Sequence, residues 1–523
     1  MSRWITVVVT MGLFVGALES LRAQGSAMAR TSAICEMCHG GSPYVFNHQG
    51  MDVSPYAGWS HSMMAFSAND PYWLAKMSAE VSARPGVRSL IENECLTCHA
   101  PLGAIESRGR GRHYSRQDLV ADPSGLEGVS CIVCHRIEGT GLGQRKGMSG
   151  HFSTALGTQV YGPYPRPFPR PMWRHTGFVP TYSQHLEDPG LCGSCHNLYT
   201  PVFDDDLEVI GEFPEQVIYS EWLVSDYASR ERTCQSCHLE SIPIQTPIAP
   251  MPPWLPPRTP VWNHEVVGGN TFMLQLLGGK FASRKIGLER TRARTRKQLE
   301  NKTLDVSLLH RASDEFLEVE VKLVNKTGHK FPTGYPERRV WIHVSMSDAS
   351  GGVFFESGKP DSKGRVVRRG ERSWEPHHDV IRSEAEVQIY EIVPANRQGE
   401  PTHRLLSASQ AVKDNRLLPR GFRPARHDLG KDVAVIGEAQ HDSSFNAKEG
   451  SDVITYRVRP PTTSMVTIDV WVYYQSIRPG AIDELRAFQT PDIRAFLEIV
   501  DELDELRPEL IWSQSLVIQT EPR

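Results

Sequence analysis

All ten cysteines of the chain occur in pairs of one form, Cys-x-x-Cys-His. The form occurs five times, as Cys35, Cys38 and His39, Cys95, Cys98 and His99, Cys131, Cys134 and His135, Cys192, Cys195 and His196, and Cys234, Cys237 and His238. This spacing is the attachment signature of a c-type haem. The two thiols add to the two vinyl groups of the porphyrin, and the following histidine is placed to give the iron an axial imidazole. We therefore predict five covalently bound haems c.

Other uses of paired cysteines fit this pattern less well. A disulfide needs no histidine after its second cysteine. A zinc site with four thiolates takes two Cys-x-x-Cys pairs and leaves one of the five pairs over. A thioredoxin-like redox motif normally occurs once in a chain. None of these alternatives predicts a histidine at the same place in all five motifs.

A haem iron with two axial protein ligands needs a second side chain. Between the N-terminal segment and residue 300 the chain has seven further histidines: His48, His61, His113, His151, His175, His185 and His264. They are enough for five bis-histidine irons, but their spacing does not pair them with particular motifs. A histidine outside this region, such as His343 on an alternating strand, is interpreted as an ordinary surface or core imidazole.

Length and composition describe an ordinary globular protein of two or three domains. The chain has 523 residues, of which 39% are hydrophobic and 23% charged, with a formal net charge of −4. This balance gives no bulk attraction to nucleic acid or to anionic membranes. We expect no nucleic-acid partner.

The N-terminus has the pattern of a secretory signal over residues 1–23. Arg3 is followed by an apolar stretch from Ile5 to Leu18 and then by small residues that lead to Ala23. The apolar stretch is shorter than the roughly 20 residues that span a bilayer. We therefore expect a periplasmic or extracellular protein without a membrane span after the signal is removed.

Residues 24–300 hold all five motifs and show little regular periodicity. Two proline-rich stretches, Pro163–Pro171 and Pro243–Pro260, predict extended connectors. We expect a loop-rich, mostly α-helical domain in which haems supply much of the core. The basic stretch Arg284–Lys297 is interpreted as a solvated helix face between domains, with haem propionates or an acidic partner as alternative targets.

Residues 301–523 change to a period of two. Apolar side chains alternate with polar ones from Leu317 to Leu323, from Val340 to Met346 and from Val466 to Val472. This pattern is typical of half-buried antiparallel strands and favours a β-sandwich-like domain. Thr490 and Pro491 predict the start of a helix near the C-terminus. The predicted fold class is therefore α+β, with a mostly α haem domain followed by a β domain that carries a terminal helix.

The sequence resembles the cytochrome c-554-like family of multihaem cytochromes, including relatives with a C-terminal β domain. The resemblance covers most of the predicted mature chain and rests on the segments Trp59–Ala65, Gly128–His135, Tyr161–Tyr164, Leu191–Asn197, Glu215–Gln216, Glu221–Trp222, His264–Asn270, Gly328–Arg339 and Lys413–Pro419. The resemblance implies distal iron ligands at some of these positions. His264, His185 and His175 are the candidates near the motifs, and His329 is the candidate from the β domain.

One segment departs from the family pattern. The family often has Trp-x-x-Ser-x-His, whereas this chain has Met64 where that histidine is expected, with Met63 and His61 close by. A haem with one histidine and one methionine ligand has a higher potential than a bis-histidine haem. The choice between Met64, Met63 and His61 stays open at this point.

Electron transfer through the five haems is the leading functional hypothesis, with redox proteins as donor and acceptor. The first alternative is an oxidoreductase that acts on a small nitrogen or sulfur compound at one five-coordinate haem. The lysine-ligated motif of pentahaem nitrite reductases is absent, because all five motifs end in histidine. The second alternative is a subunit of a conductive or docking assembly, in which a β-domain histidine such as His329 or His378 ligates an iron of another subunit.

Overall fold

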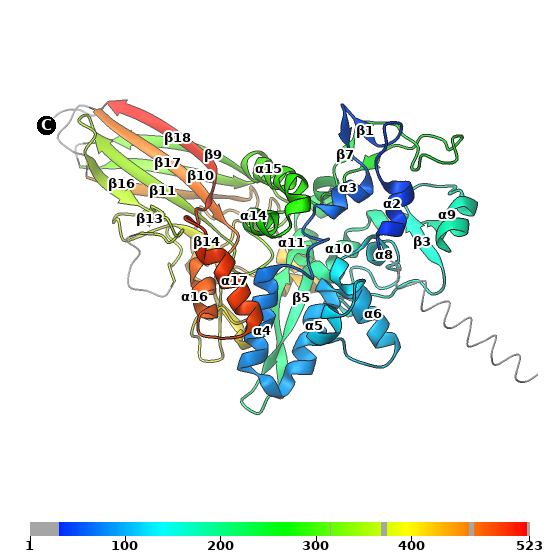
Figure 1. The fold of residues 1–523 in the computed structure, drawn as a ribbon. Coiled ribbons are helices and arrows are strands. Elements are labelled where there is room, and N and C mark those ends of the chain that lie inside the picture. The colour runs from blue at the N-terminus through cyan, green and yellow to red at the C-terminus, as the bar shows by residue number, and fades with distance from the viewer. Residues whose placement is uncertain (1–30, 314, 368–373, 460–464, 520–523) are drawn as a thin grey trace, which may run out of the picture. The chain divides into compact units, whose positions relative to one another are not determined.

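The computed structural model describes residues 31–313, 315–367, 374–459 and 465–519 (Figure 1). The signal peptide predicted for residues 1–23 lies outside the described residues. Within the described ranges, no helix is long and apolar enough to cross a membrane. Helices dominate the first part of the chain and antiparallel sheets the last part, so the predicted α+β fold class is confirmed.

The chain divides into two compact units that alternate along the sequence. We call the described residues of 1–70, 87–194 and 234–266 the motif unit, and those of 71–86, 195–233 and 267–523 the sheet unit. The fourth motif spans a boundary, because Cys192 belongs to the motif unit whereas Cys195 and His196 belong to the sheet unit.

The motif unit consists of short helices joined by long loops. Its helices are α2 (Ala33–His39), α3 (Pro55–Ser60), α5 (Arg88–His99), α6 (Pro101–Gly109), α7 (Arg116–Val120), α8 (Cys131–Cys134), α9 (Pro169–Thr176), α10 (Pro189–His196), which ends in the sheet unit, and α13 (Cys234–His238). Its strands form three small pairs, β1 (Asn47–His48) with β2 (Met51–Asp52), β3 (Gln159–Gly162) with β4 (Val179–Tyr182), and β7 (Ser241–Ile242) with β8 (Val261–Trp262). A small apolar cluster around Val45, Phe46 and Val261 joins the first and last of these segments.

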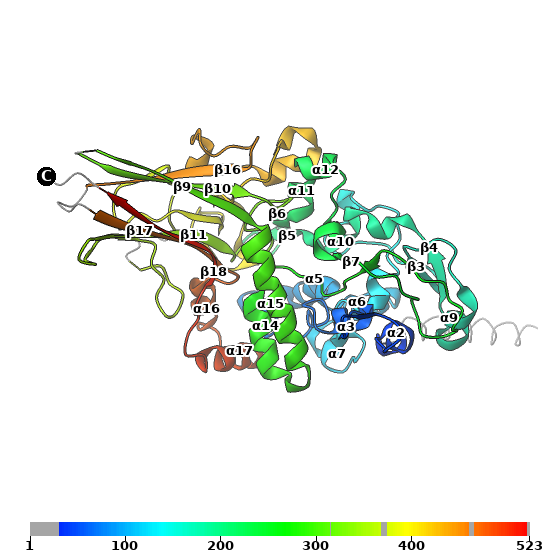
Figure 2. The ribbon, with the colours of Figure 1, turned by 90° about the horizontal axis from the view of Figure 1, so that it is seen from above.

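The two larger β-sheets of the sheet unit have four and six strands, and Figure 2 shows them as two layers. The first sheet has the order β13 (Val380–Ile381), β16 (Ser451–Val458), β10 (Leu317–Asn325) and β9 (Leu304–Ala312). The second has the order β15 (Gln410–Asp414), β14 (Ile389–Ala395), β11 (Arg339–Asp348), β17 (Met465–Gln475) and β18 (Glu509–Gln519), with β12 (Val353–Ser357) on β11. All neighbours are antiparallel except β13 and β16, which are parallel.

The alternation seen in the sequence sets the faces of these strands. On β10, Leu317, Val319, Val321 and Leu323 are fully buried, whereas Glu318 pairs across the sheet with Arg457 of β16. The central strand β11 is buried on both faces, because the loops around Val366 and Val387 cover Trp341 on its second face. His343 of β11 is also buried, with its ring centre 4.4 Å from that of Trp471.

Helices complete the sheet unit: α4 (Pro71–Ala83), α11 (Ile218–Leu223), α12 (Asp226–Ser229), α14 (Thr271–Lys280), α15 (Lys285–Lys302), α16 (Pro479–Leu485) and α17 (Pro491–Asp501). The predicted cap of α17 is present, since the Thr490 hydroxyl accepts a hydrogen bond from the backbone N–H of Ile493. Strand β18 follows α17, so this helix does not end the domain. α4 packs on α17, where the ring centres of Tyr72 and Phe496 are 5.3 Å apart.

The predicted basic helix is α15. Its Arg296 guanidinium forms an ion pair of 2.7 Å with Glu509 of β18, and Arg292 lies 3.9 Å from the same carboxylate. Its buried residues, Leu288, Thr291, Thr295 and Leu299, lie on one stripe of the helix. These contacts bind the helix to the sheet unit's own strand β18.

A hairpin follows the fourth motif and carries a buried carboxyl group. Its strands are β5 (Asn197–Phe203) and β6 (Val209–Val217), and Glu215 of β6 is 4% exposed. The loss of hydration raises the pKa of Glu215 from 4.5 to about 7.

Replacing Glu215 by Gln is expected to change how stability depends on pH. The folded protein holds the Glu215 proton between about pH 4.5 and 7, where the unfolded chain releases it, so stability falls as pH rises through this window. This pKa shift lowers the free energy of unfolding by about 3 kcal/mol above pH 7, compared with its value below pH 4.5. Urea unfolding at pH 5 and pH 8 measures it, and E215Q should reduce the difference between the two. An unchanged difference would show that Glu215 titrates as it does in the unfolded chain. The exposed substitution Glu212→Gln is the control.

Candidate haem-binding site

Each motif lies on a short helix. Four of the helices, α2, α5, α10 and α13, end at the motif histidine, and α8 ends one residue before His135. On a helix, residues three and four apart face the same side. Both thiols and the imidazole of each motif therefore point to one side of its helix, as attachment to a single porphyrin requires. All ten cysteines are unbridged and partly buried.

The attachment thiols of different motifs are neighbours within the motif unit. The Cys35 thiol forms a hydrogen bond with the Cys131 thiol, and the Cys192 thiol forms one with the Cys234 thiol. Burial raises the pKa of Cys134 in the third motif, and the nearby Cys192 thiol of the fourth motif raises it further. The first, third, fourth and fifth motifs are thus joined in that order.

The second motif joins this series at Gly150. The Gly150 N–H donates to the carbonyl of Ser194, inside the fourth motif, at 2.8 Å. A Cβ at Gly150 would lie 3.2 Å from Cys98 Sγ and 2.4 Å from the Thr97 methyl group, both in the second motif. Only glycine allows this close approach, and its φ of +79° also favours glycine.

Motif histidines are held in the tautomer that binds a metal. The Nδ1 atoms of His39, His99 and His135 contact the backbone carbonyls of Ile248, Ser67 and Tyr161 at 2.9, 3.0 and 2.7 Å. A carbonyl only accepts, so Nδ1 carries the proton and Nε2 has the lone pair that ligates iron.

His264 faces His135 at the separation expected of two ligands on one iron. Their ring centres are 6.4 Å apart and their planes differ by 19°. An imidazole nitrogen lies about 2 Å from the metal that it ligates, so two rings on opposite sides of one metal have centres roughly 6 Å apart. His264 Nδ1 donates to the Trp262 carbonyl at 2.8 Å, and burial lowers the pKa of His264 to about 4, so its ring is neutral at pH 7.

The backbone around His264 is fixed by helix α3. A Cβ at Gly58 of α3 would lie 3.1 Å from the backbone nitrogen of His264 and 3.0 Å from that of Glu265. Glycine at position 58 therefore lets the helix approach the His264 backbone. His61 follows α3 directly, and its Nδ1 contacts the Ala57 carbonyl at 2.8 Å. This is the same arrangement as at the motif histidines.

His151 shows the arrangement too, although the sequence offered no reason to single it out. Its Nδ1 donates to the Met148 carbonyl at 3.0 Å, and it follows Gly150, the residue that joins the second and fourth motifs. His151 is recognised as a candidate ligand by the backbone carbonyl that holds its Nδ1, and no sequence motif marks it.

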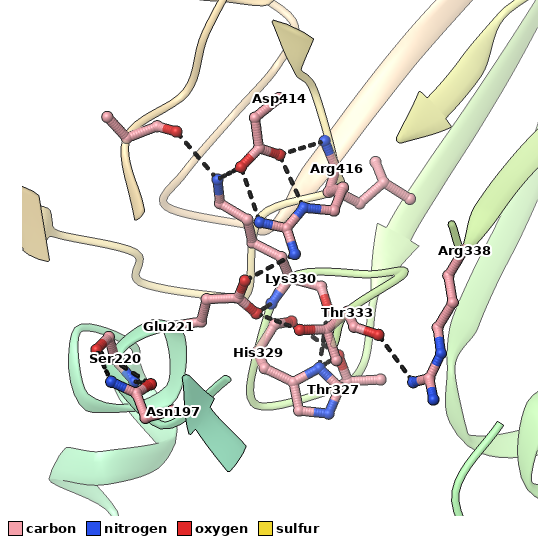
Figure 3. A network of polar contacts seen from close by, with 12 residues as sticks. Asn197, Ser220, Glu221, Thr327, His329, Lys330, Thr333, Arg338, Asp414 and Arg416 are labelled. Carbon is pink, nitrogen blue, oxygen red and sulfur yellow. Dashed lines mark hydrogen bonds and ion pairs between the residues drawn. The ribbon is translucent and has the colours of Figure 1, made fainter. Parts of the chain in front are cut away.

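His329 belongs to the sheet unit and is held in a loop with a buried polar network (Figure 3). Its Nδ1 donates to the Lys330 carbonyl at 2.8 Å. The neighbouring Gly328 packs on Tyr227 and Trp222, since a Cβ there would lie 3.1 Å from the first ring and 3.3 Å from the second.

Buried charges of both signs hold this loop in place. The Lys330 ammonium is 2.7 Å from Asp414, and its backbone N–H donates to Glu221 at 3.0 Å (Figure 3). Arg416 contacts both carboxylates at 2.8 Å. Glu221 also accepts from the Thr333 hydroxyl, and its neighbour Ser220 is hydrogen-bonded to Asn197, which follows His196. The network thus joins the loop of His329 to the end of the fourth motif.

The other predicted distal ligands lie in different surroundings. His185 Nε2 contacts the Ile137 carbonyl at 2.8 Å and its Nδ1 contacts the Ser183 hydroxyl at 2.5 Å, so both ring nitrogens are engaged. His175 is exposed on α9. The Met64 carbonyl accepts from the Val129 N–H, one residue after Gly128. In the segment from His61 to Met64, His61 is the favoured ligand because the Ala57 carbonyl holds its Nδ1.

Arg136 provides a test of whether the site fits a haem. It follows His135, is 1% exposed, and donates to the carbonyls of Ala155 and Gly157. Its Nε and Nη1 atoms have no hydrogen-bond partner among the described residues. A buried cation without an anion is costly. A haem propionate would supply that anion, so the surroundings of the third motif fit a haem.

Replacing Arg136 by Gln is therefore expected to lower the midpoint potential of one haem. The loss of a nearby positive charge disfavours the reduced iron, by roughly 30–60 mV for a change near 1 kcal/mol. Spectroelectrochemical titration measures the shift, and R136K should keep most of the wild-type potential. Equal titration curves for R136Q and wild type would contradict the pairing of Arg136 with a haem propionate.

A cluster of His377, Asp442 and Asp452 in the sheet unit has the side chains of a metal site but not the tautomer. His377 Nδ1 accepts from the amide nitrogens of Gln388 and Asn415 at 2.9 and 3.1 Å. Backbone N–H groups donate to the oxygens of both amides and fix their orientation. Nε2 therefore carries the proton and donates to Asp442 at 3.0 Å, so it has no lone pair for a metal.

The comparisons with known proteins agree with this architecture. No protein-family model and no curated protein matches the sequence. Among solved structures, the chain is similar to a penta-heme cytochrome c552 from Thermochromatium tepidum, with 16% sequence identity and a TM-score of 0.54. The match covers 94% of this chain and 100% of that chain. At this identity the likeness concerns the fold.

Proposed function

We propose that this protein transfers electrons outside the cytoplasm through five covalently bound haems c. The observation that carries the proposal is the series of neighbouring attachment thiols. Because each thiol binds the edge of a porphyrin, neighbouring thiols require neighbouring haems. The series gives an electron path through haems 1, 3, 4 and 5, numbered by motif, with haem 2 beside haem 4.

The held tautomers support axial ligation by histidine. The motif histidines supply the proximal ligands. His264 is the distal ligand of haem 3, opposite His135, and His61, His151 and His329 supply distal ligands to other haems. Neutral imidazoles on both sides of an iron keep it low-spin and exclude small molecules from it. Such haems exchange electrons and do no bond chemistry, which suits a carrier.

Intact-mass measurement and electron paramagnetic resonance of the purified exported protein test this proposal. We expect a mass of polypeptide plus five haems, and low-spin signals for the bis-histidine irons. A redox titration should show several one-electron steps. A mass equal to that of the bare polypeptide, with thiols on zinc or in disulfides, would overturn it.

One observation favours a second candidate function, an oxidoreductase for a small nitrogen or sulfur compound. Among the described residues, four non-motif histidines have Nδ1 held by a backbone carbonyl, namely His61, His151, His264 and His329, whereas there are five motifs. One haem would then lack a distal histidine of this kind. A high-spin ferric signal together with turnover of nitrite or hydroxylamine would favour this candidate over a carrier.

A further inference from the structure

The two proline-rich stretches form one surface of the motif unit. The Tyr164 hydroxyl donates to the Pro260 carbonyl at 2.7 Å, and the Arg258 guanidinium donates to the carbonyls of Pro165 and Arg166 at 3.3 and 3.1 Å. Arg258 also lies over the Tyr164 ring. We call residues 163–174 and 250–260 the proline-rich surface. Proline limits the backbone freedom of both stretches, so binding to them costs little ordering entropy.

Large apolar side chains are exposed on both stretches of this surface. Phe168 and Trp173 on the first are 47% and 59% exposed, and Met251 and Trp254 on the second are 66% and 73% exposed. Aromatic residues, methionine and arginine are the residue types enriched at protein interfaces. Solvent-exposed tryptophans on a stiff backbone are typical anchors of such interfaces.

The charge of this surface has one sign. No Asp or Glu occurs between Glu138 and Glu187, nor between Glu240 and Glu265, although the whole chain has a net charge of −4. Arg166, Arg170 and Arg174 are exposed along the first stretch. An acidic partner is attracted to this face.

Both stretches lead directly to haem ligands. Tyr161, two residues before the first stretch, gives the carbonyl that holds His135, and Ile248, two residues before the second, gives the carbonyl that holds His39. The surface therefore belongs to the segments that flank the proximal sides of haems 1 and 3. A partner bound there would be close to two haems of the proposed path.

We propose that the proline-rich surface is the docking site for an acidic redox protein that exchanges electrons with haem 1 or haem 3. This inference rests on the proposed electron-transfer function and adds the place and the chemistry of the partner. Tryptophan and methionine side chains form the contact, and the arginines orient the partner.

Stopped-flow reduction of the oxidised full-length holoprotein tests this site. The probe is reduced flavodoxin, a soluble flavoprotein with a strongly negative net charge. The test variant is R166E/R170E/R174E. The control variant, R382E/R397E/K448E, makes the same change of charge at exposed positions of the sheet unit. W173S/W254S removes the anchors and leaves the charge unchanged. Haem content is measured for every variant.

We expect the wild-type rate with flavodoxin to fall as salt is added, because charge attraction accelerates association. The test variant should be at least tenfold slower at low ionic strength, and its rate should no longer fall as salt is added. The control variant should stay within twofold of wild type, and W173S/W254S should be slower at every salt concentration. Dithionite should reduce the haems equally in all variants. Haems that dithionite does not reduce would contradict the proposed function and not the docking site.

Four results would overturn the docking site. Equal slowing of the test and control variants would assign the effect to net charge. Wild-type rates in the test variant would show that the surface takes no part. Binding to phosphatidylglycerol vesicles that only the test variant loses, with unchanged flavodoxin rates, would make the surface a membrane contact. A dimer that dissociates only in the test variant would make it a contact between copies of this chain.

Discussion

Replacing His264 by Met is expected to change one haem of the five and to leave the other four as they are. His264 faces His135 with ring centres 6.4 Å apart, and its Nδ1 is held by the Trp262 carbonyl. A thioether ligand in place of an imidazole favours the reduced iron, so the potential of haem 3 should rise by on the order of 100 mV. Spectroelectrochemical titration would resolve one component that moves. Replacement by Ala should instead give one high-spin ferric signal.

His185→Met is the matched control for this prediction. His185 lies in the same unit and was an equally plausible ligand by sequence, but its Nε2 contacts the Ile137 carbonyl. Its replacement should leave every haem low-spin and every potential within a few tens of millivolts, since no axial ligand is lost. A larger change in H185M than in H264M would reverse the two roles.

Replacing Asp414 by Asn is expected to cause the largest loss of stability. Asp414 is buried between Lys330 and Arg416, and the substitution keeps its shape while leaving two buried cations with one carboxylate, Glu221. Breaking a buried ion pair in this way costs about 3–5 kcal/mol. Urea unfolding followed by far-ultraviolet circular dichroism measures the change.

The same variant should alter the acid limb of the stability curve. The two cations lower the pKa of Asp414 from 3.8 to about 2. The ionised carboxylate therefore stabilises the fold above about pH 4, and this contribution is lost as the pH falls through 2. D414N should be less sensitive to acid over this range. Asp305→Asn, which removes an exposed pair with Lys326, is the control and should cost less than about 1 kcal/mol. Similar losses in both variants would contradict the role of burial.

Strands β10 and β17 were predictable because apolar and polar side chains alternate along them. From Leu317 to Leu323 and from Val466 to Val472, every second side chain is buried, as the alternation predicted. The Thr490 cap likewise marked the start of α17. Strand β18 was not predicted, since its middle residues Ser513, Gln514 and Ser515 interrupt the apolar alternation. Hydrogen bonding to β17 makes this segment a strand, although its own sequence lacks the alternation.

A local motif is enough to predict the haem attachment residues, whereas it does not predict the second ligands. Cys-x-x-Cys-His is a local motif whose chemistry depends on spacing alone. A distal histidine is selected by long-range packing and by the carbonyl that holds its Nδ1. The sequence favoured His185 over His151, yet only His151 has Nδ1 on a backbone carbonyl with no carbonyl at Nε2 among the described contacts. Arg136 likewise stood out only in the structure, as a buried side chain with two nitrogens that have no hydrogen-bond partner among the described residues.

The packing of α4 on α17 affects the order in which the protein can fold. These helices come from opposite ends of the chain, and Tyr72 of α4 is buried against Phe496. During synthesis from the N-terminus, α4 is therefore made long before its packing partner. Contacts of such large sequence separation form late and slow the final folding step. A fragment that stops at residue 300 would leave the apolar face of α4 in water, so the haem-bearing half should aggregate when it is produced alone.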